Sequence, residues 1–345
     1  MNATDRSTDG GVLTDRTGRW EHEAGLEQGE GAFGTEPNPT GNPIGGGEGY
    51  SEIHIEGDCV ADSYEALRDA LGEAKSGEVV FIPGEAKICM DGHEALTIPE
   101  GVTVASSRGF DGSPGGMVYA DDLSRPGMLS SGGDCVRVTG LRVRGPYPHR
   151  DRIDRSSSGL SSGHYATEID NCEVSGFRAS ATSFRQGANR GYVHHNHIHH
   201  NQQAGLGYGV SLGGAFVLIE GNCFDWCRHH IASSGAPGSG YEARYNVCGE
   251  NANGHLFDMH GGRDRGDATD IAGDWMNVHH NTIHCTEARS VGVRGVPSQG
   301  AKIHHNWFYS PDPANIVRTS GGTEAYQNVL GPDRLLLDRL EIENV

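Results

Sequence analysis

The chain has 345 residues, of which 46 are Asp or Glu and 27 are Lys or Arg, so its formal net charge is -19. This charge excludes nucleic-acid binding through a basic surface and argues against adhesion to an anionic membrane. Only three of the 27 cations are lysines, and this bias together with the acidic excess is typical of a high-salt, haloarchaeal-type proteome. The 53 glycines and the hydrophobic content of 35% favour many short strands over a thick helical core.

The first 50 residues differ in composition from the rest of the chain. They are rich in Gly, Asp, Glu and Pro and end in NPTGNPIGGGEGY, which predicts an extended or partly disordered arm over residues 1–50. The chain contains no run of about 18 apolar residues, and its N-terminus has neither a basic start nor an apolar stretch. We therefore expect no membrane span and no standard signal peptide. The location stays open between the cytoplasm and an extracellular or particle-associated site reached by another route.

One amphipathic helix follows the arm, in the segment DSYEALRDALGEAKSG at residues 62–77. Its apolar positions fall on one helical face: Tyr64, Leu67, Ala70, Leu71 and Ala74. Asp62 or Ser63 is the expected N-cap, and Gly77 is the expected stop. Only short apolar runs come after this helix, beginning with VVFI at residues 79–82.

An internal repeat determines the predicted architecture. An apolar residue, a polar stretch that contains Asn and a second apolar residue recur in IDNCEV (169), VHHNHI (193), IEGNCF (219), ARYNVC (243), VHHNTI (278), IHHNWF (303) and AYQNVL (325). The spacings are 24, 26, 24, 35, 25 and 22 residues. A period near 24 suits one coil of a parallel β-helix, with three short strands per coil and a stacking distance of about 4.8 Å.

The asparagines of this repeat predict a structural ladder. Six of them share one repeat position: Asn196, Asn222, Asn246, Asn281, Asn306 and Asn328. Asn171 stands one residue earlier and is included in the expected ladder. A buried amide at a turn can bond to the equivalent amide of each neighbouring coil, so we expect these residues to stabilise the stack and not to take part in chemistry.

The Gly-rich lead-in PIGGGEGY, the helix YEALRDALGEA, the strand ending VVFIPG and repeats such as VHHNHI resemble the pectate lyase-like superfamily. The resemblance implies an all-β, right-handed, single-stranded parallel β-helix over residues 51–345 with an N-terminal capping helix. That superfamily contains lyases, hydrolases, epimerases, esterases and viral spike adhesins. The resemblance therefore indicates a fold and leaves the activity open.

A second alignment gathers chemically active residues on one face. Matching the glycine that closes each strand aligns HHIASSG (229–235), HLFDMHG (255–261), RSVGVRG (289–295) and NIVRTSG (315–321). Alternation along the strands then points Asp258, His260, Arg294 and Arg318 outward within three adjacent coils. The 35-residue interval adds the loop GGRDRGDATDIAGDW beside them, and such insertions commonly wall a binding groove.

These residue types fit β-elimination on an acidic polysaccharide. A base removes the proton next to a uronate carboxylate whose charge is neutralised by Arg or a metal. His260 is the predicted base, Asp258 orients it, and Arg294 with Arg318 holds the sugar carboxylate. The Asp-x-His of FDMHGG is also similar to the Asp-Pro-His element of alginate epimerases, without its Pro, which implies the same two residues for proton abstraction.

Further residues are expected to contact the glycan. They are Arg228, His229, His230, His255 and Arg263, which precede the aligned strands or lie in the insertion. No cofactor is required by the sequence. Calcium is the expected metal by analogy with pectate lyases, with Asp258, Asp264 or Asp267 as ligands. A transition metal would use the cluster of His229, His230, His255, His260 and Asp258.

Two alternatives remain at this stage. A glycoside hydrolase would need Asp225 and Asp264 to join Asp258, because hydrolysis requires carboxylates about 5 to 9 Å apart. A non-catalytic β-helix, such as a surface or particle spike that binds glycans, would need none of these groups for chemistry. The sequence contains no coiled coil, and the oligomeric state stays open.

Overall fold

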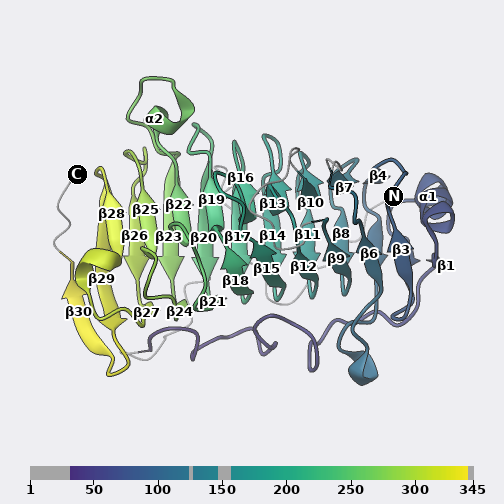
Figure 1. Cartoon of the computed structure of the whole chain (residues 1–345), viewed down its shortest axis with the longest axis horizontal. Helices are drawn as coiled ribbons and strands as arrows, with labels where there is room; N and C mark the ends of the chain where they lie inside the picture. Colours follow the sequence, from purple (N-terminus) through teal and green to yellow (C-terminus); the bar gives the residue numbers. More distant parts are fainter. Residues whose placement is uncertain (1–31, 124–126, 147–156, 341–345) are drawn as a thin grey trace, which may run out of the picture.

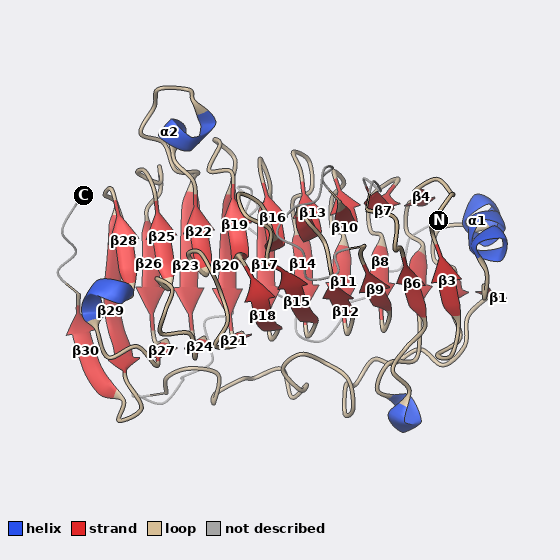
Figure 2. Cartoon of the chain, in the orientation of Figure 1, coloured by secondary structure: helices blue, strands red, loops and turns tan. Residues whose placement is uncertain are grey.

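The chain winds into stacked coils of short parallel strands (Figure 1). The computed structural model describes residues 32–123, 127–146 and 157–340. The strands form three rows along a right-handed parallel β-helix, and the helices are few and short (Figure 2). The predicted fold class is confirmed. No helix in the described part of the chain is long and apolar enough to cross a membrane.

The three rows follow one another in each coil. The first row contains β4 Leu96–Ile98, β7 Gly127–Ser131, β10 Ser158–Ser162, β13 Ser180–Phe184, β16 Tyr208–Leu212, β19 His229–Ser233, β22 Phe257–Met259, β25 Val291–Val293 and β28 Val317–Thr319. The second contains β1 Cys59–Val60, β2 Val79–Phe81, β5 Thr103–Ala105, β8 Arg137–Thr139, β11 Glu168–Asp170, β14 Gly191–His194, β17 Phe216–Glu220, β20 Gly240–Arg244, β23 Trp275–His279, β26 Ala301–His304 and β29 Thr323–Leu330. The third contains β3 Lys87–Cys89, β6 Met117–Tyr119, β9 Arg142–Arg144, β12 Glu173–Ser175, β15 His197–Asn201, β18 Cys223–Cys227, β21 Val247–Cys248, β24 Thr282–Ile283 and β27 Trp307–Phe308.

Successive repeats stack residue on residue. Val193 pairs with Ile219 and Ile219 with Ala243, and the same register runs on through Val278 to Ile303. All of these side chains are buried in one continuous apolar core. The sequence period therefore predicts the strand register correctly, because each coil must place its apolar residues above those of the coil before it.

The asparagine ladder forms as predicted at six positions. The Nδ2 of each Asn from Asn196 to Asn306 donates to the Oδ1 of the next ladder Asn at 2.9 to 3.0 Å. Each side-chain oxygen also accepts the backbone N–H of the Asn one coil earlier, as Asn281 does from Asn246 at 2.9 Å. The ladder thus satisfies polar groups at a corner that excludes water.

Asn171 does not belong to the ladder, contrary to prediction. It occupies the left-handed position just before the ladder, with φ 51, and its Oδ1 accepts from the Gly47 backbone at 2.7 Å. Cys172 takes the ladder position in this coil, where its N–H donates to Asn196 Oδ1 at 2.8 Å. The one-residue offset of Asn171 in the sequence therefore marks a different structural role: Asn171 binds the N-terminal arm and Cys172 takes the ladder position.

The helix α1, Tyr64–Glu73, covers one end of the stack (Figure 1). Ser63 is the N-cap and accepts from Ala66 N–H at 3.3 Å. The helix ends at Glu73, four residues before the predicted stop at Gly77, because the backbone turns extended at Ala74. Tyr64, Leu67 and Leu71 are buried against the first coil, so α1 shields its open strand edges.

The other end and the corners carry the remaining elements. They are the strand β30, Leu335–Arg339, which pairs antiparallel with β29, the short helix α2, Gly262–Arg265, and the 3-10 turns Phe110–Gly112 and Pro313–Asn315. The helix α2 lies in the loop added by the 35-residue interval and projects beyond the strands (Figure 1). This insertion therefore rises next to β22 and β25.

The described part of the N-terminal arm runs along the solenoid against the direction of the coils. Gly34 N–H donates to His305 O at 2.9 Å, and Gly45 N–H donates to Gly221 O at 2.8 Å. Further along, the Tyr50 hydroxyl donates to Asp170 at 2.9 Å. Residues 32–50 are therefore extended and bound to the turns that follow the second row of strands. Residues 1–31 of the predicted arm lie outside the described part of the chain.

Candidate active site

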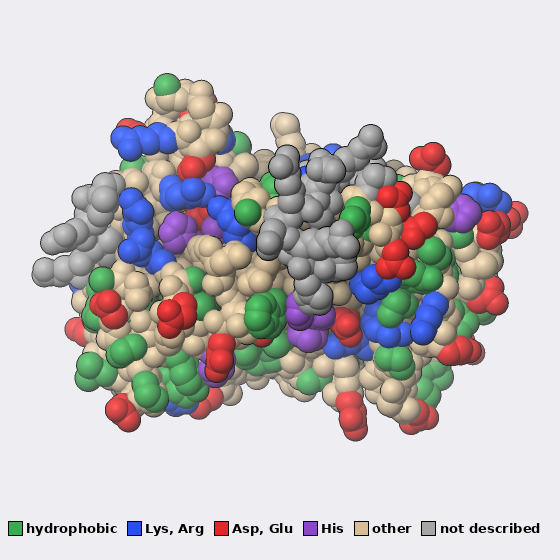
Figure 3. All heavy atoms as spheres, viewed as in Figure 1, with side chains coloured by type: hydrophobic (Ala, Val, Ile, Leu, Met, Phe, Trp, Pro, Cys, Tyr) green, Lys and Arg blue, Asp and Glu red, His purple; other side chains and the backbone are tan. Residues whose placement is uncertain are grey.

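The candidate site lies on the outward face of the first row of strands. Ala232, Asp258, Gly292 and Arg318 occupy equivalent positions on β19, β22, β25 and β28. Basic and histidine side chains gather on this face below α2 (Figure 3). The predicted alignment of the four strands is therefore correct, and it places the chemically active residues side by side.

Asp258 is the centre of the site. It points outward from β22 and yet is fully buried, because neighbouring side chains cover it. Arg294 binds it through both carboxylate oxygens, with Nε 3.1 Å from Oδ1 and Nη2 2.7 Å from Oδ2. His260 Nε2 lies 3.0 Å from Oδ2, at an angle outside hydrogen-bond geometry. Such a bidentate arginine holds the plane of the carboxylate in one orientation.

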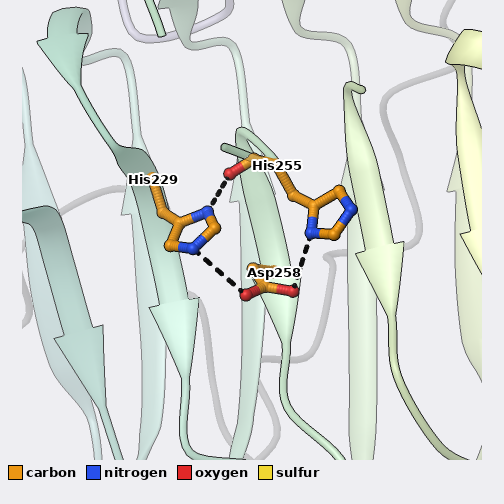
Figure 4. A group of neighbouring side chains, drawn as sticks. All are labelled: His229, His255 and Asp258. Carbon is orange, nitrogen blue, oxygen red and sulfur yellow. Dashed lines mark hydrogen bonds and ion pairs between the residues drawn. The ribbon is translucent and has the colours of Figure 1, made fainter. Parts of the chain in front are cut away.

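Two more histidines approach Asp258 from the other side (Figure 4). His229 Nε2 lies 3.5 Å from Oδ2, and His255 Nδ1 lies 3.5 Å from Oδ1. His229 Nδ1 also donates to the His255 backbone carbonyl. Asp258 is thus surrounded by three imidazoles and one guanidinium.

This environment keeps Asp258 ionised. Burial alone would raise the pKa of its carboxyl, but the His255 and His260 rings and the charge of His229 outweigh it and hold the pKa well below the usual range. Burial has the opposite consequence for His229, where it lowers the pKa to about 4 although Asp258 opposes the shift. At neutral pH the site therefore contains a carboxylate beside a neutral His229.

A groove of about 320 Å³ opens beside this cluster. Its described lining residues are Arg228, His229, Ala252, Asn253, Gly254, His255, Glu287, Ala288, Arg289 and Arg294. Three of the ten are arginines and only Glu287 is acidic. Arg294 is paired with Asp258 and Asp264, so Arg228 and Arg289 are the basic groups that the groove offers, on a chain whose net charge is -19. An anionic ligand is therefore favoured here in spite of the acidity of the whole molecule.

The insertion contributes one residue to the cluster. Arg294 Nη1 donates to Asp264 Oδ1 at 2.8 Å, so this arginine joins the loop to the strand face. Arg263 is exposed on α2. Arg265 instead binds within the loop, to Asp267 at 2.8 Å and to the backbone of Ser234. The loop is therefore braced by its own arginine and does not offer it to a ligand.

The predicted calcium ligands do not converge. Among the described residues, Asp258, Asp264 and Asp267 do not form a group with ligand atoms within 4.8 Å of one another. Arg294 lies between the first two, and Asp267 bonds to Thr269 and Arg265. The Arg294 guanidinium thus lies between Asp258 and Asp264, the three carboxylates do not form one shared site, and calcium at any one of them stays a prediction.

Two predicted roles also change. Arg294 was expected to bind the sugar carboxylate, but Asp258 and Asp264 already occupy its donors. His230 was expected to contact the glycan, but its ring is fully buried in the core and stacks on Phe224 at 5.4 Å. Arg318 is exposed in the row of Asp258, and Arg228, His229 and His255 line the groove, where contact with a glycan stays a prediction.

Arg289 is a groove residue that the sequence reasoning missed. The four aligned segments begin with His229, His255, Arg289 and Asn315, so the first column of the alignment is polar throughout. The second column holds His230, Leu256, Ser290 and Ile316 and is fully or nearly fully buried. Comparing each position across the four aligned segments would have shown that His229 lies in a polar column and His230 in a buried one. Alternation along a single strand does not show this difference.

A second group of candidate ligands, Glu168, Asp170 and His194, is already saturated. Arg137 holds Asp170 with Nε at 2.9 Å and Nη2 at 2.8 Å, and Thr139 donates to it at 2.7 Å. Burial raises the pKa of Tyr50 above its usual range, so its phenol remains a donor to Asp170. This group therefore anchors the arm.

Comparison with known proteins gives one similar fold and no family. No family model matches the chain, and no curated protein matches it. Among solved structures, the crystal structure of an alginate lyase from Paenibacillus sp. str. FPU-7 is similar, with a TM-score of 0.56 and 15% sequence identity. The match covers 79% of this chain and 95% of that chain. At this identity the likeness shows a shared fold.

Proposed function

We propose that the chain binds an acidic polysaccharide in the groove beside Asp258 and cleaves it by β-elimination. The observation that supports this function most is a buried, ionised carboxylate that lies between Arg294 and the partly exposed His260, next to a groove that His229, His255 and three arginines line. The alginate lyase with a similar fold acts on such a polymer, which agrees with the proposal.

His260 is the proposed base. Its Nε2 lies 3.0 Å from Asp258 Oδ2, and an unprotonated nitrogen so close to a carboxylate would be repelled by its charge, so we place the proton of the neutral ring on Nε2. This leaves Nδ1 unprotonated. Because Nε2 is buried and the side chain is 22% exposed, the accessible part of the ring is the part beyond Nε2. Asp258 acts as a positioning residue that stabilises the imidazolium formed when Nδ1 takes a proton.

The arginines supply the remaining electrostatics. When the base removes the proton at C5 of the uronate, negative charge develops on the sugar carboxylate, and a nearby guanidinium stabilises it. Arg228 and Arg289 line the groove and are the proposed partners of that carboxylate. The C4–O bond then breaks, a C4–C5 double bond forms, and the departing oxygen takes a proton from solvent. Arg263 and Arg318 are exposed nearby and extend the basic surface for a longer polymer.

Hydrolysis is less well supported. It needs an acid and a second carboxylate about 5 to 9 Å apart across the scissile bond. Asp258 stays ionised, Asp264 is bound to Arg294, and Asp225 lies on β18 in the third row, where it accepts from Asn251 N–H at 3.0 Å. Of the described groove residues, only Glu287 carries a carboxylate. Elimination requires a single base and fits this set better.

The test is an absorbance assay for unsaturated products on a panel of uronate polymers in molar salt. We expect the intact protein to release such products from at least one polymer. The double variant Asp258→Asn with His260→Ala should lose activity by about 10²- to 10⁴-fold, the usual contribution of a general base. His284→Asn is the matched control, because this half-buried histidine lies beyond β24 in the third row.

Two outcomes would contradict the proposal. Absence of unsaturated products from the intact protein on every polymer would exclude elimination on those substrates, and retained glycan binding would then favour a non-catalytic β-helix. Full activity in the double variant would exclude Asp258 and His260 as the reacting pair.

A further inference from the structure

One buried ring nitrogen in the site, His229 Nε2, has no hydrogen-bond partner among the described residues. His229 Nδ1 faces the His255 carbonyl oxygen, and only a protonated Nδ1 can make that hydrogen bond. The neutral ring therefore presents a bare lone pair at Nε2, which points toward Asp258 Oδ2 at 3.5 Å. This Nε2 is buried and has no hydrogen-bond partner, and the side chain is only 2% exposed. Two electron-rich atoms thus face each other in a dry site, where a cation between them would be stabilised.

The spacing of the surrounding atoms matches a metal site. His229 Nε2, His255 Nδ1 and a carboxylate oxygen of Asp258 all lie within 4.8 Å of one another. The two short His–Asp distances are both 3.5 Å and run to different oxygens, Oδ2 for His229 and Oδ1 for His255. Two ligands bound tetrahedrally to zinc at about 2.0 to 2.1 Å are about 3.4 Å apart. Each His–Asp pair therefore has the spacing of two zinc ligands, and all three donors would share one ion if the carboxylate bound it through both oxygens or if one ring shifted toward the other.

The outer contacts are those that metal ligands usually have. A metal-bound imidazole commonly donates its other N–H to a backbone carbonyl, as His229 does to His255. A metal-bound carboxylate is itself commonly hydrogen-bonded, as Asp258 is by Arg294. These contacts orient both groups before any ion binds.

The charge balance leaves room for a cation. Asp258 and Asp264 carry two negative charges, and Arg294, which bridges them, carries one positive charge. The histidines add no charge when they are neutral, so the cluster has an excess of one negative charge. The His255 side chain is 21% exposed and lines the groove, which leaves one side of the site open to a ligand.

We propose that His229 Nε2, His255 Nδ1 and Asp258 bind one divalent transition metal ion of the zinc class, with a fourth position open to the groove. Two imidazoles and one carboxylate suit such an ion better than calcium, which prefers oxygen ligands. The open position would accept an anionic oxygen of the polymer. The metal site shares Asp258 with the proposed elimination, and its contact with the polymer rests on the proposed function. The ion itself can be tested separately, because the proposed base His260 is not among its ligands.

The test uses the full chain, stripped with a chelator and titrated with Zn²⁺ by calorimetry and with Co²⁺ by visible absorption. We expect one high-affinity ion per chain and Co²⁺ bands of the intensity typical of four-coordinate sites. His229→Gln and His255→Gln should each weaken Zn²⁺ binding by about 10- to 100-fold or more. His255 is partly exposed, so its variant keeps the test valid if the buried His229 variant does not fold.

His260→Gln is the matched control. Its ring contacts the same carboxylate but is not a proposed ligand, so this variant should keep the metal and lose elimination. Because the chain has 19 histidines, weak binding elsewhere is separated by comparing the variants and not by total uptake. Stoichiometry well below one ion, or affinity unchanged in both ligand variants, would overturn the metal site and leave the proposed elimination untouched.

Discussion

Gly292 provides the space in which His255 reaches Asp258. A Cβ built at this residue would lie 2.8 Å from both Cγ and Nδ1 of the His255 ring and 3.1 Å from Asp258 Oδ1. Real Cβ atoms essentially never approach so closely, so any other residue must displace the ring or the carboxylate. The backbone of Gly292 is an ordinary strand, and the glycine is needed here for lack of a side chain.

We therefore expect Gly292→Ala to separate His255 from Asp258 without unfolding the chain. Zn²⁺ affinity should fall by about 10-fold or more, since one ligand leaves its position, whereas the melting temperature should change little. Calorimetric titration and circular dichroism measure the two effects. Gly127→Ala is the control in the same row of strands, because its Cβ would meet only Ser158 O at 3.7 Å. Unchanged affinity in the Gly292 variant would show that His255 does not need this position.

At the residue scale, the sequence predicts the cluster better than the roles within it. Asp258, His260 and Arg294 converge because the apolar columns determine the register of β22 and β25. The partnership of Arg294 with Asp264 could not be predicted, since it depends on how the inserted loop folds back across the strands. His230 was misassigned because strict alternation fails at the start of β19, where His230 and Ile231 are both buried.

At the scale of the elements, the asparagine ladder stabilises the turns between the second and third rows of strands. Asn281 Oδ1 accepts from the backbone and the side chain of Asn246, both at 2.9 Å, and its Nδ2 donates to Asn306 at 3.0 Å. All three residues are fully buried. Loss of one amide therefore leaves several buried donors and acceptors without hydrogen-bond partners.

Asn281→Ala should destabilise the protein by about 3 kcal/mol or more, because two or more buried polar groups each lose a partner worth about 1 to 3 kcal/mol. Asn251→Ala should cost much less, since this half-buried residue bonds to the accessible Asp225. Thermal and denaturant unfolding compare the two variants. Equal losses would mean that the ladder is no stronger than a surface hydrogen bond.

Cys172→Asn should extend the ladder by one coil. Cys172 already occupies the ladder position, with its sulfur 3.6 Å from Val138 O, the carbonyl that an Asn Nδ2 would reach. The new amide would also donate to Asn196 Oδ1. We expect unfolding to become harder by up to about 1 kcal/mol, a typical net value for one buried hydrogen bond. A clear destabilisation would show that this corner is too narrow for an amide.

The elements also show why some boundaries escaped prediction. The repeat motif determines the second and third rows from β14 and β15 onward, because one turn with a ladder residue joins the two rows there. The end of α1 at Glu73 depends on how Ala74 meets the first coil, and no local signal marks it. Local chemistry thus predicts which elements form, and packing decides where they stop.

At the scale of the whole molecule, buried neutral histidines make stability depend on pH. Burial lowers the pKa of His195 and His197 to about 4, of His230 to about 3 and of His304 to about 2. In the unfolded chain these rings take up protons below their ordinary value of 6.5, and in the folded chain they do so only at lower pH. Their contribution is therefore complete above pH 6.5 and is lost as the pH falls below 6.5, down to about 4 for His195 and His197 and to lower pH for His230 and His304.

We expect the melting temperature to fall over this range at constant salt, with each such histidine adding up to about 1.4 kcal/mol per pH unit to the slope. His230→Leu tests one of them, because the same column holds Leu256 and both ring nitrogens of His230 lack partners among the described residues. This variant should be more stable than the original chain, most of all near pH 5. A melting temperature that is flat or rises between pH 7 and pH 5 would contradict the assignment.

The arm also constrains the order in which the molecule assembles. During synthesis α1 and the first coils emerge early and can stack one upon another, since each coil contacts mainly its neighbours. Gly34, however, binds the carbonyl of His305, which is made 271 residues later. The first stretch of the described chain must therefore wait for nearly the last coil before its final contact can form. The final docking of the arm can therefore occur only after the stack of coils is complete. A chain truncated before that coil would keep its other coils but lose the contact between Gly34 and His305.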